Sequence, residues 1–466
     1  MAARVKLDQL TQEHKKKIRK DLYLQPVQAG FFKHSRFTGT KDPILFYTVD
    51  KPNEEIVLPY TYGNSLMGYH INSKRQYPGG KFNFNKDIKW RDHQIPIING
   101  GMSYLQTKGT FIMGAFPGAG KTLMSSWMAS SLGGLVLVII PSLTMVLKGW
   151  DCTFKEYTDA KVWVNNGKNP MPEECNVILT MDTMFHKIDS KVLMMVHTLI
   201  IDEAHKFCSP GRINCLLASC PKYIIACTAT LERSDGMHSI IHRLCGTHGI
   251  FIKSQKPFKV YKLETGIKKE LEKTKQGNTD WPKLVRDLSF DKNRNSLIFN
   301  ILSSNPQHKI LVLTWNVQHA YYLHKVLKEK EKCDVLAGSK SDYFDSRILI
   351  GTMGKCNCGF DEATSCIDWG GIRLNMILLV GSTKSISTLD QTIGRVFRSD
   401  DPIVIDFVDA DRISKNQWRQ RLKLYEDPER NGEVVYLSKI KDENNKDEEN
   451  EKLHMKQLMK HQLKNK

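Results

Sequence analysis

The feature that most constrains this chain is the stretch FIMGAFPGAGKT, Phe111 to Thr122. A short apolar run enters a glycine-rich turn that ends in Gly-Lys-Thr, and a segment compatible with a helix follows. The backbone N–H groups of such a turn, with the partial positive charge of a helix N-terminus, form a site for a polyphosphate. The stretch therefore predicts a phosphate-binding loop between a strand and a helix.

Two side chains of this loop have specific expected roles. Lys121 is expected to reach the β- and γ-phosphates, and the Thr122 hydroxyl is expected to ligate Mg²⁺. The first glycine of the usual GxxxxGK[ST] pattern is replaced by Ala115, which fits there if its φ is negative. The candidate nucleotide-binding residues of the loop are Ala115, Phe116, Pro117, Gly118, Ala119, Gly120, Lys121 and Thr122.

Length and composition describe a globular protein. The 466 residues are enough for two or three domains, and 41% hydrophobic with 25% charged residues is ordinary for that class. The longest apolar stretch, near Leu132–Pro141, is too short to span a bilayer, and the N-terminus lacks the apolar core of a signal peptide. We therefore expect an intracellular protein, cytoplasmic or nuclear. The resemblance described below adds a viral factory or a virion as further locations.

The eleven cysteines are scattered, which suits reduced thiols in a reducing compartment. Cys356, Cys358 and Cys366 form the one cluster, and the sequence offers no fourth ligand at a spacing typical of zinc. We therefore do not expect a metal at these thiols.

The net charge of +18 is the more informative number. The last thirty residues carry 8 Lys against 6 acids, so an excess of +16 is spread through the rest of the chain. Basic proteins bind nucleic acids largely by neutralising phosphates, so a nucleic-acid partner is predicted.

Strand-like apolar runs alternate with helix-like segments in two blocks of the chain. A continuous apolar run such as Gly134–Pro141 is typical of a strand buried on both faces of a parallel sheet. The alternation predicts an α/β fold with two parallel sheets covered by helices. The expected parts are an N-terminal accessory domain at 1–88, a first domain at 89–248, a connecting arm at 249–290, a second domain at 291–436 and a charged tail at 437–466, disordered or a lone helix.

The N-terminal domain contains a lysine-rich stretch, His14–Lys20, that the sequence alone leaves open. A solvated helix face is the favoured interpretation, and a nuclear address or a phosphate-contacting face are the alternatives.

A second motif, LIIDEAH, ends an apolar run in two acids. Ligand-binding side chains belong at the carboxyl ends of parallel strands, where the loop, these acids and Thr228 all fall. Asp202 is expected to hold Mg²⁺, and Glu203 is expected to polarise the attacking water. Adjacent acids after a strand also occur by chance, but their place downstream of the phosphate-binding loop favours the ATPase interpretation.

A third motif, QTIGRVFR, spans Gln391 to Arg398. Arg395 and Arg398 lie three residues apart, so a continuous helix would put both on one face. Arginines presented in this way stabilise the charge that develops in phosphoryl transfer. On its own, the segment would favour an amphipathic helix with exposed arginines.

In chain order these motifs resemble those of the superfamily 2 helicases, over roughly Trp90 to Asp411. The further matches are Asp92-His93-Gln94, Ile140-Pro141-Ser142, Thr180, Asp202-Glu203-Ala204-His205, Thr228-Ala229-Thr230, Leu313–Asn316, Gly351-Thr352 and Gly359-Phe360-Asp361. The resemblance implies two tandem RecA-like domains that bind ATP and Mg²⁺ between them and move on nucleic acid. It also implies an adenine-side role for Gln94, nucleotide contacts for Gly359 and Asp361, and catalytic roles for His205 and Gln391 beside Lys121, Asp202, Glu203, Arg395 and Arg398.

Within that superfamily the WRDHQ opening and compact second domain look similar to the DNA-directed branch that includes XPB and UvsW, and to transcript-release helicases of poxviruses and other large DNA viruses. The resemblance implies a DNA helicase of 3′-to-5′ polarity, with viral transcription or replication proteins as further partners. The short loop Leu336–Ser346 and the insertion CNCGFDEATSCIDWGG depart from the family pattern. A translocase or transcript-release ATPase that does not unwind, an RNA helicase, and a non-catalytic nucleic-acid-binding scaffold remain as alternatives.

Overall fold

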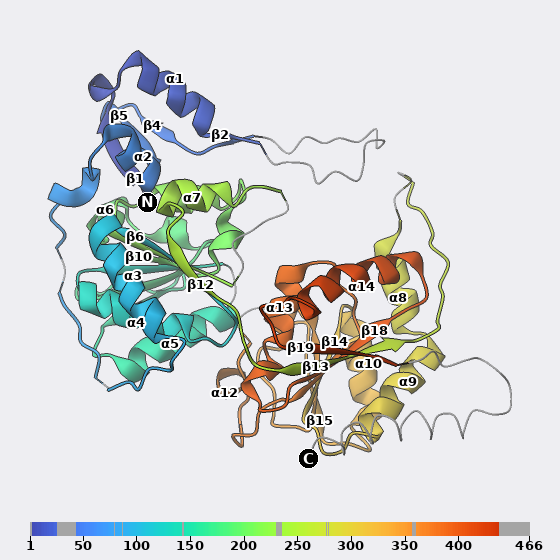
Figure 1. The fold of residues 1–466 in the computed structure, drawn as a ribbon. Coiled ribbons are helices and arrows are strands. Elements are labelled where there is room, and N and C mark those ends of the chain that lie inside the picture. Colours follow the sequence, from blue (N-terminus) through green and yellow to red (C-terminus); the bar gives the residue numbers. More distant parts are fainter. Residues whose placement is uncertain are drawn as a thin grey trace, which may run out of the picture. The chain divides into compact units, whose positions relative to one another are not determined.

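The structure is a computed structural model that describes residues 2–25, 43–78, 80–85, 87–141, 144–229, 235–275, 277, 279–356 and 360–437. The chain forms two compact units, Met1–Lys253 and Ser254–Lys466 (Figure 1). Each unit is built on a seven-stranded parallel sheet, as the alternation of strands and helices predicts. The α/β class and the two-sheet architecture are therefore confirmed. No helix in the described ranges is long and apolar enough to cross a membrane.

The sheet of the first unit has the strand order β12-β6-β11-β10-β7-β9-β8. Its strands are β6 (Thr110–Ala115), β7 (Val136–Ile140), β8 (Val162–Asn165), β9 (Val177–Met181), β10 (Thr198–Ile201), β11 (Tyr223–Thr228) and β12 (Gly249–Ile252). The strands β6, β7 and β10 are buried along their whole length, because helices or loops cover both faces of the sheet.

Successive residues of the strands point to opposite faces, and each face has its own hydrophobic core. Phe111 and Met113 of β6 belong to one core, which also contains residues of α3 (Ile95–Lys108), α4 (Lys121–Leu132) and α5 (Thr144–Tyr157). Ile112 belongs to the opposite core, with residues of α6 (Ser190–Met195) and α7 (Ser239–Cys245). The predicted alternation of strands and helices is present in this unit.

The N-terminal segment is part of the first unit. It contains β1 (Ala2–Lys6), β4 (Thr48–Asp50) and β5 (Glu55–Pro59) in an antiparallel sheet, the pair β2 (Tyr23–Leu24) and β3 (Ile44–Leu45), and helices α1 (Gln12–Asp21) and α2 (Tyr60–Met67). The amide of Ala2 donates a 2.8 Å hydrogen bond to the carbonyl of Ser219, and Asn72 bonds the carbonyls of Ala2 and Pro221. The apolar residues of this segment belong to the same core as Ile112, on one face of the parallel sheet, so the segment is not separate from the first domain.

The sheet of the second unit has the strand order β15-β16-β14-β17-β18-β13-β19. Its strands are β13 (Phe258–Glu264), β14 (Ile310–Thr314), β15 (Cys333–Leu336), β16 (Ile348–Thr352), β17 (Met376–Leu379), β18 (Ile403–Val408) and β19 (Gly432–Leu437). Its helices are α8 (Trp281–Ser289), α9 (Lys292–Ser303), α10 (Val317–Leu327), α11 (Met353–Cys356), α12 (Glu362–Ser365), α13 (Ile386–Ile393) and α14 (Arg412–Tyr425).

The structure corrects the predicted connecting arm at 249–290. Gly249–Ile252 pairs with β6 in the first sheet, and Phe258–Glu264 lies between β18 and β19 in the second. Two charges of this segment pair within β13, since Lys262 forms a 2.7 Å ion pair with Glu264. The predicted tail also begins too early, because Leu437 ends β19; the rest of that prediction lies outside the described residues.

Two buried ion pairs attach helices to β18 and to the residue just after it. Arg421 of α14 makes two 2.8 Å hydrogen bonds to Asp406, which also accepts one from Tyr425. Arg294 of α9 bonds both carboxylate oxygens of Asp409. Removing one partner would leave a buried charge alone, so these pairs fix the helices on the sheet.

Candidate nucleotide site

The phosphate-binding loop lies between β6 and α4, as predicted. Gly118 and Gly120 have φ values of 86° and 91°, which a side chain would make unfavourable. Among the described residues only Glu54 and Glu203 are non-glycine residues with positive φ, so Ala115 meets the condition set by the sequence. Gly120 is the N-cap of α4 and has no side chain to occupy the first N–H groups of the helix, which fits a bound phosphate.

Gln94 braces this loop from the start of α3. Its Nε2 donates a 2.8 Å hydrogen bond to the carbonyl of Ala119, and its Oε1 accepts one from the amide of Arg91. A Cβ at Gly120 would lie 2.5 Å from Nε2 of Gln94, so the close approach also requires glycine. The neighbouring His93 ring lies 5.3 Å from the ring of Phe116. The structure thus places Gln94 against the loop backbone.

The ammonium group of Lys121 folds back over the loop. Nζ donates hydrogen bonds to the carbonyl oxygens of Ala115, at 2.8 Å, and Phe116, at 3.3 Å. These carbonyls hold the ammonium group at the opening of the loop, where phosphate oxygens would replace them as hydrogen-bond acceptors.

Asp202 follows the last residue of β10 and is 8% exposed. Its Oδ2 accepts a 2.8 Å hydrogen bond from the indole N–H of Trp150, and its Oδ1 accepts one from the amide of Glu203. Burial first, and the charge of Glu203 second, raise the pKa of this carboxyl, whereas Trp150 and Lys121 act to lower it. A nearby cation would favour the charged form, so the carboxyl is suited to a divalent metal.

Glu203 has a left-handed backbone, with φ 48° and ψ 50°. This conformation is costly for a glutamate and is typical of residues whose direction matters to a site. His205 lies close by, with Nδ1 3.5 Å from Oε2 of Glu203 and 2.9 Å from Oγ1 of Thr228. The ends of β10 and β11 are thereby joined through side chains.

The first unit thus brings together most of the predicted residues of the nucleotide site. The loop follows β6, Asp202 and Glu203 follow β10, and Thr228 ends β11, so all lie at the carboxyl edge of neighbouring strands. Thr122 and Asp202 supply the hard oxygen ligands that Mg²⁺ prefers. Gly359 and Thr230 lie outside the described residues.

The arginine motif of the second unit differs from its predicted form. Helix α13 ends at Ile393 with Gly394 as its C-cap, and Arg398 ends the 3₁₀ turn Val396–Arg398. The two arginines therefore do not share one face of a continuous helix. They nevertheless reach consecutive residues: Arg395 Nη1 donates a 2.6 Å hydrogen bond to the carbonyl of Phe360, and Arg398 Nη1 donates one of 2.5 Å to Asp361. Gln391 is buried on α13.

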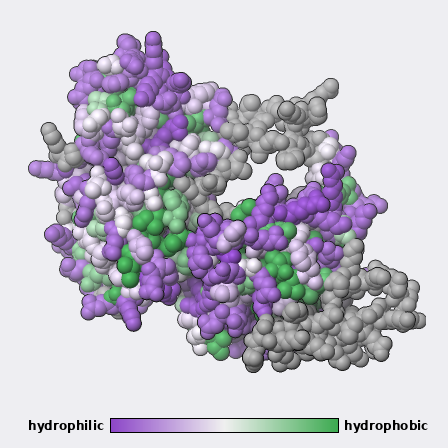
Figure 2. Space-filling model, in the orientation of Figure 1, coloured by the Kyte–Doolittle hydropathy of each residue, from purple (hydrophilic) through white to green (hydrophobic). Residues whose placement is uncertain are grey.

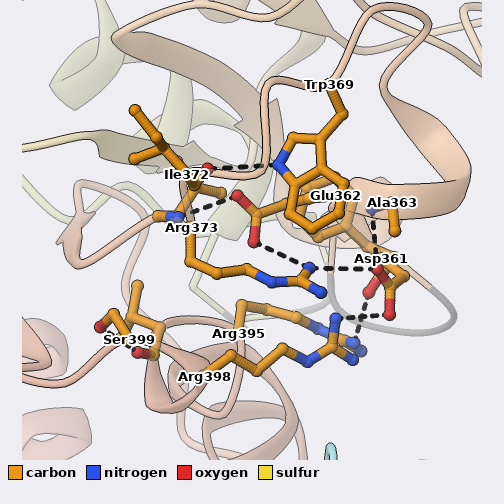
Figure 3. Close-up of polar contacts among 12 residues, drawn as sticks. Asp361, Glu362, Ala363, Trp369, Ile372, Arg373, Arg395, Arg398 and Ser399 are labelled. Carbon is orange, nitrogen blue, oxygen red and sulfur yellow. Dashed lines mark hydrogen bonds and ion pairs between the residues drawn. The ribbon is translucent and has the colours of Figure 1, made fainter.

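Asp361 is the centre of a charged cluster that the motifs did not predict in full (Figure 3). Its carboxylate also accepts a hydrogen bond from Arg373, whose guanidinium contacts Glu362 and lies 4.2 Å from the ring centroid of Trp369. Burial alone would raise the pKa of Asp361, but the charges of Arg398 and Arg373 and the Ala363 amide together lower it. Trp369 belongs to the insertion and Arg373 lies two residues after its end, and no sequence signal marked either of them.

Comparisons with known proteins agree with this geometry. The family model described as "Type III restriction enzyme, res subunit" matches residues 87–233. "Putative helicase 161L" of Invertebrate iridescent virus 6 is 25% identical over 404 residues, which cover 80% of this chain and 88% of that protein. "DNA 3'-5' translocase XPB2" of Sulfurisphaera tokodaii is 24% identical, and the matched residues cover 67% of this chain and 80% of that protein.

A solved structure has the same fold. The structure of S. cerevisiae Dbp5 bound to RNA and ADP BeF3 aligns with a TM-score of 0.52 at 13% identity, over 77% of this chain and 92% of that chain. The two tandem parallel-sheet domains therefore have the RecA-like arrangement of strands and helices that the motifs implied.

Proposed function

We propose that the chain, an ATP-hydrolysing helicase related to the superfamily 2 helicases and acting on nucleic acid, is directed to DNA and moves with 3′-to-5′ polarity. The observation that supports the chemistry most directly is the joint placement of the phosphate-binding loop and the Asp202-Glu203 pair at one edge of the first sheet. The support for DNA is that the relative from Sulfurisphaera tokodaii is named a DNA 3'-5' translocase.

We assign the steps of hydrolysis to residues of the chain as follows. The loop amides and Lys121 bind the phosphates of ATP, and Gln94 keeps the loop in its binding shape. Mg²⁺, when bound to Thr122 and Asp202, supplies charge that stabilises the departing phosphate. Glu203 orients the attacking water and accepts its proton. His205, through Thr228, connects this step to the adjacent strand.

The second unit contributes its arginines in this proposal. Arg395 and Arg398 stabilise the negative charge on the γ-phosphate as it transfers, and Asp361 sets the direction of Arg398 beforehand. Gln391 and Gly359 are the remaining residues to which the resemblance assigns a role at the nucleotide site. A cycle of ATP binding and hydrolysis then alternates the grip of the two units on a strand, and proteins of viral transcription or replication are the further partners we propose.

The test combines hydrolysis with strand displacement. Purified full-length chain is assayed for ATP hydrolysis with single-stranded DNA, duplex DNA and RNA, and then on duplexes with 3′ or 5′ overhangs. The proposal predicts the largest stimulation with DNA and displacement only from 3′ overhangs. Stimulation by RNA alone would contradict the choice of DNA, and displacement from 5′ overhangs would contradict the polarity.

A translocase that moves without unwinding is the second candidate. It uses the same motifs, and none of the site geometry separates it from a helicase. DNA-stimulated hydrolysis without displacement from either overhang, but with removal of a protein block from the strand, would favour it. A non-catalytic scaffold requires the loss of Lys121, Glu203 or Arg398, and all three are present.

A further inference from the structure

A cationic groove lies on the second unit and is lined by none of the motif residues assigned above. A cavity of about 400 Å³ is lined by Lys268, Ala410, Arg412, Lys415, Asn416 and Arg419. These residues follow the carboxyl ends of β13 and β18 or lie on α14. A second cavity of about 280 Å³ shares Ala410, Lys415 and Arg419 with the first, so the two are parts of one elongated groove.

In the described part of the chain, the charge of the first cavity is not neutralised by ion pairs, whereas the second cavity is lined by Lys262 and Glu264, which pair with each other. The four cations Lys268, Arg412, Lys415 and Arg419 are exposed, and within the described ranges none forms an ion pair with a carboxylate. The one printed side-chain bond among them joins Arg419 to the amide oxygen of Asn416. Four unpaired like charges around one cavity repel each other, so an anionic ligand would relieve that cost.

The spacing of the cationic residues along α14 explains why they line one groove. Residues 412, 415, 416 and 419 follow the i, i+3, i+4, i+7 spacing of one helix face, while Arg421 is buried on the other. The bonds from Arg421 to Asp406 and Thr383 anchor the buried face, so the cationic face is presented by a rigid helix. Figure 2 shows hydrophilic residues gathered over the region that Figure 1 labels α14.

We propose that this groove, the α14 groove, binds the phosphate backbone of a nucleic-acid strand as a contact surface additional to the helicase motifs. Its extent over two cavities, its two arginines and the absence of lining acids in its first cavity favour a polyanion over a small ligand. The second cavity adds the ring of Trp418, over which the ammonium of Lys262 lies at 5.4 Å. The inference rests on the proposed function, since it names a surface that the moving strand follows.

The test compares two charge-matched triple variants of the full-length chain. The first is Arg412→Glu, Lys415→Glu and Arg419→Glu. The control is Lys325→Glu, Lys328→Glu and Lys332→Glu, which alters exposed residues of the same unit just before β15, at the amino edge of the sheet. Binding of a labelled 30-nucleotide strand is measured from 50 to 300 mM salt, with the melting temperature of each variant as the check on folding.

The α14 variant should bind at least about tenfold more weakly at 100 mM salt. The slope of log K against log salt should fall by about two, since each lost phosphate contact removes about 0.7 for a single strand. The control should keep the wild-type slope. Equal losses of affinity in both variants would overturn the proposal for the groove, and so would wild-type affinity and slope in the α14 variant. The proposal would also be overturned if an acidic peptide displaced the strand from the wild type but not from the α14 variant. A wild-type chain that binds no nucleic acid would overturn the proposed function as well.

Discussion

Nη1 of Arg398 donates a 2.5 Å hydrogen bond to Oδ2 of Asp361, so the arginine assigned to the γ-phosphate is held in a fixed direction by the second unit itself. Arg395 is held in the same way by the carbonyl of Phe360. A preorganised donor costs little reorganisation when charge develops during reaction. In the proposed function the Asp361 cluster positions the arginines of the second unit, and this effect on hydrolysis can be measured separately from folding.

Replacing Arg398 by alanine should slow hydrolysis far more than it weakens ATP binding. An arginine that meets transferring phosphate contributes on the order of 10³ or more to kcat, so a loss of at least about 10²-fold is expected. The dissociation constant for ATP should change by less than about threefold. Arg286→Ala, at an exposed position on α8, is the matched control and should keep the wild-type kcat. Equal losses in kcat and ATP affinity would contradict the assignment.

Replacing Arg373 should reduce kcat through Asp361. Arg373 bonds Asp361 and Glu362 and lies against Trp369, so its loss frees the carboxylate that directs Arg398. We expect Arg373→Ala to lower kcat by about fivefold to tenfold with the KM for ATP nearly unchanged, and Arg373→Lys to restore part of it. A drop in melting temperature with an unchanged kcat would mean that the cluster is only structural.

Trp150→Phe should shift the acid limb of the pH profile of kcat/KM upward. The indole N–H lowers the pKa of Asp202, so without it the carboxyl would keep its proton to higher pH and compete less well for Mg²⁺. The variant should also need more Mg²⁺ for half-maximal rate. Trp163→Phe is the control, because the described residues include no polar partner for that indole. Parallel shifts in both variants would indicate a general packing effect.

The stability of the second unit should decrease in mild acid because of His319. Burial, followed by the charge of Arg294, lowers the pKa of this imidazole to about 3, and its Nε2 lies 2.8 Å from Oδ1 of Asn295. Between about pH 6.5 and 3 the unfolded chain binds the proton and the folded chain does not, so stability falls as pH falls. The expected cost is about 1.4 kcal/mol for each pH unit below 6.5.

The measurement for His319 is the urea midpoint at pH 7.5 and pH 5.5. His319→Gln keeps a polar group for Asn295 but cannot be protonated, so its midpoint should change less over this range. The same loss of stability in both chains would assign the acid sensitivity to other groups.

The parts of the site that were predictable are those encoded by local pattern. The loop at 111–122, the acids after β10 and the alternation of strands follow from short spacings, and each lies where the sequence placed it. The unpredicted parts depend on contacts between distant residues. Trp150 reaches Asp202 from a different helix, and Arg373 reaches Asp361 from an irregular loop. The insertion of β13 between β18 and β19 was equally invisible, because charged residues on a strand resemble a linker.

The most direct test of the account is nucleic-acid-stimulated ATP hydrolysis by wild type and Lys121→Ala. Lys121 closes the phosphate-binding loop through the carbonyls of Ala115 and Phe116, so its removal should reduce DNA-stimulated turnover by at least about 10²-fold. Binding of a single-stranded DNA without nucleotide should change by less than about threefold. Stimulated turnover at the wild-type rate in Lys121→Ala would contradict the assignment of this loop as the ATP site.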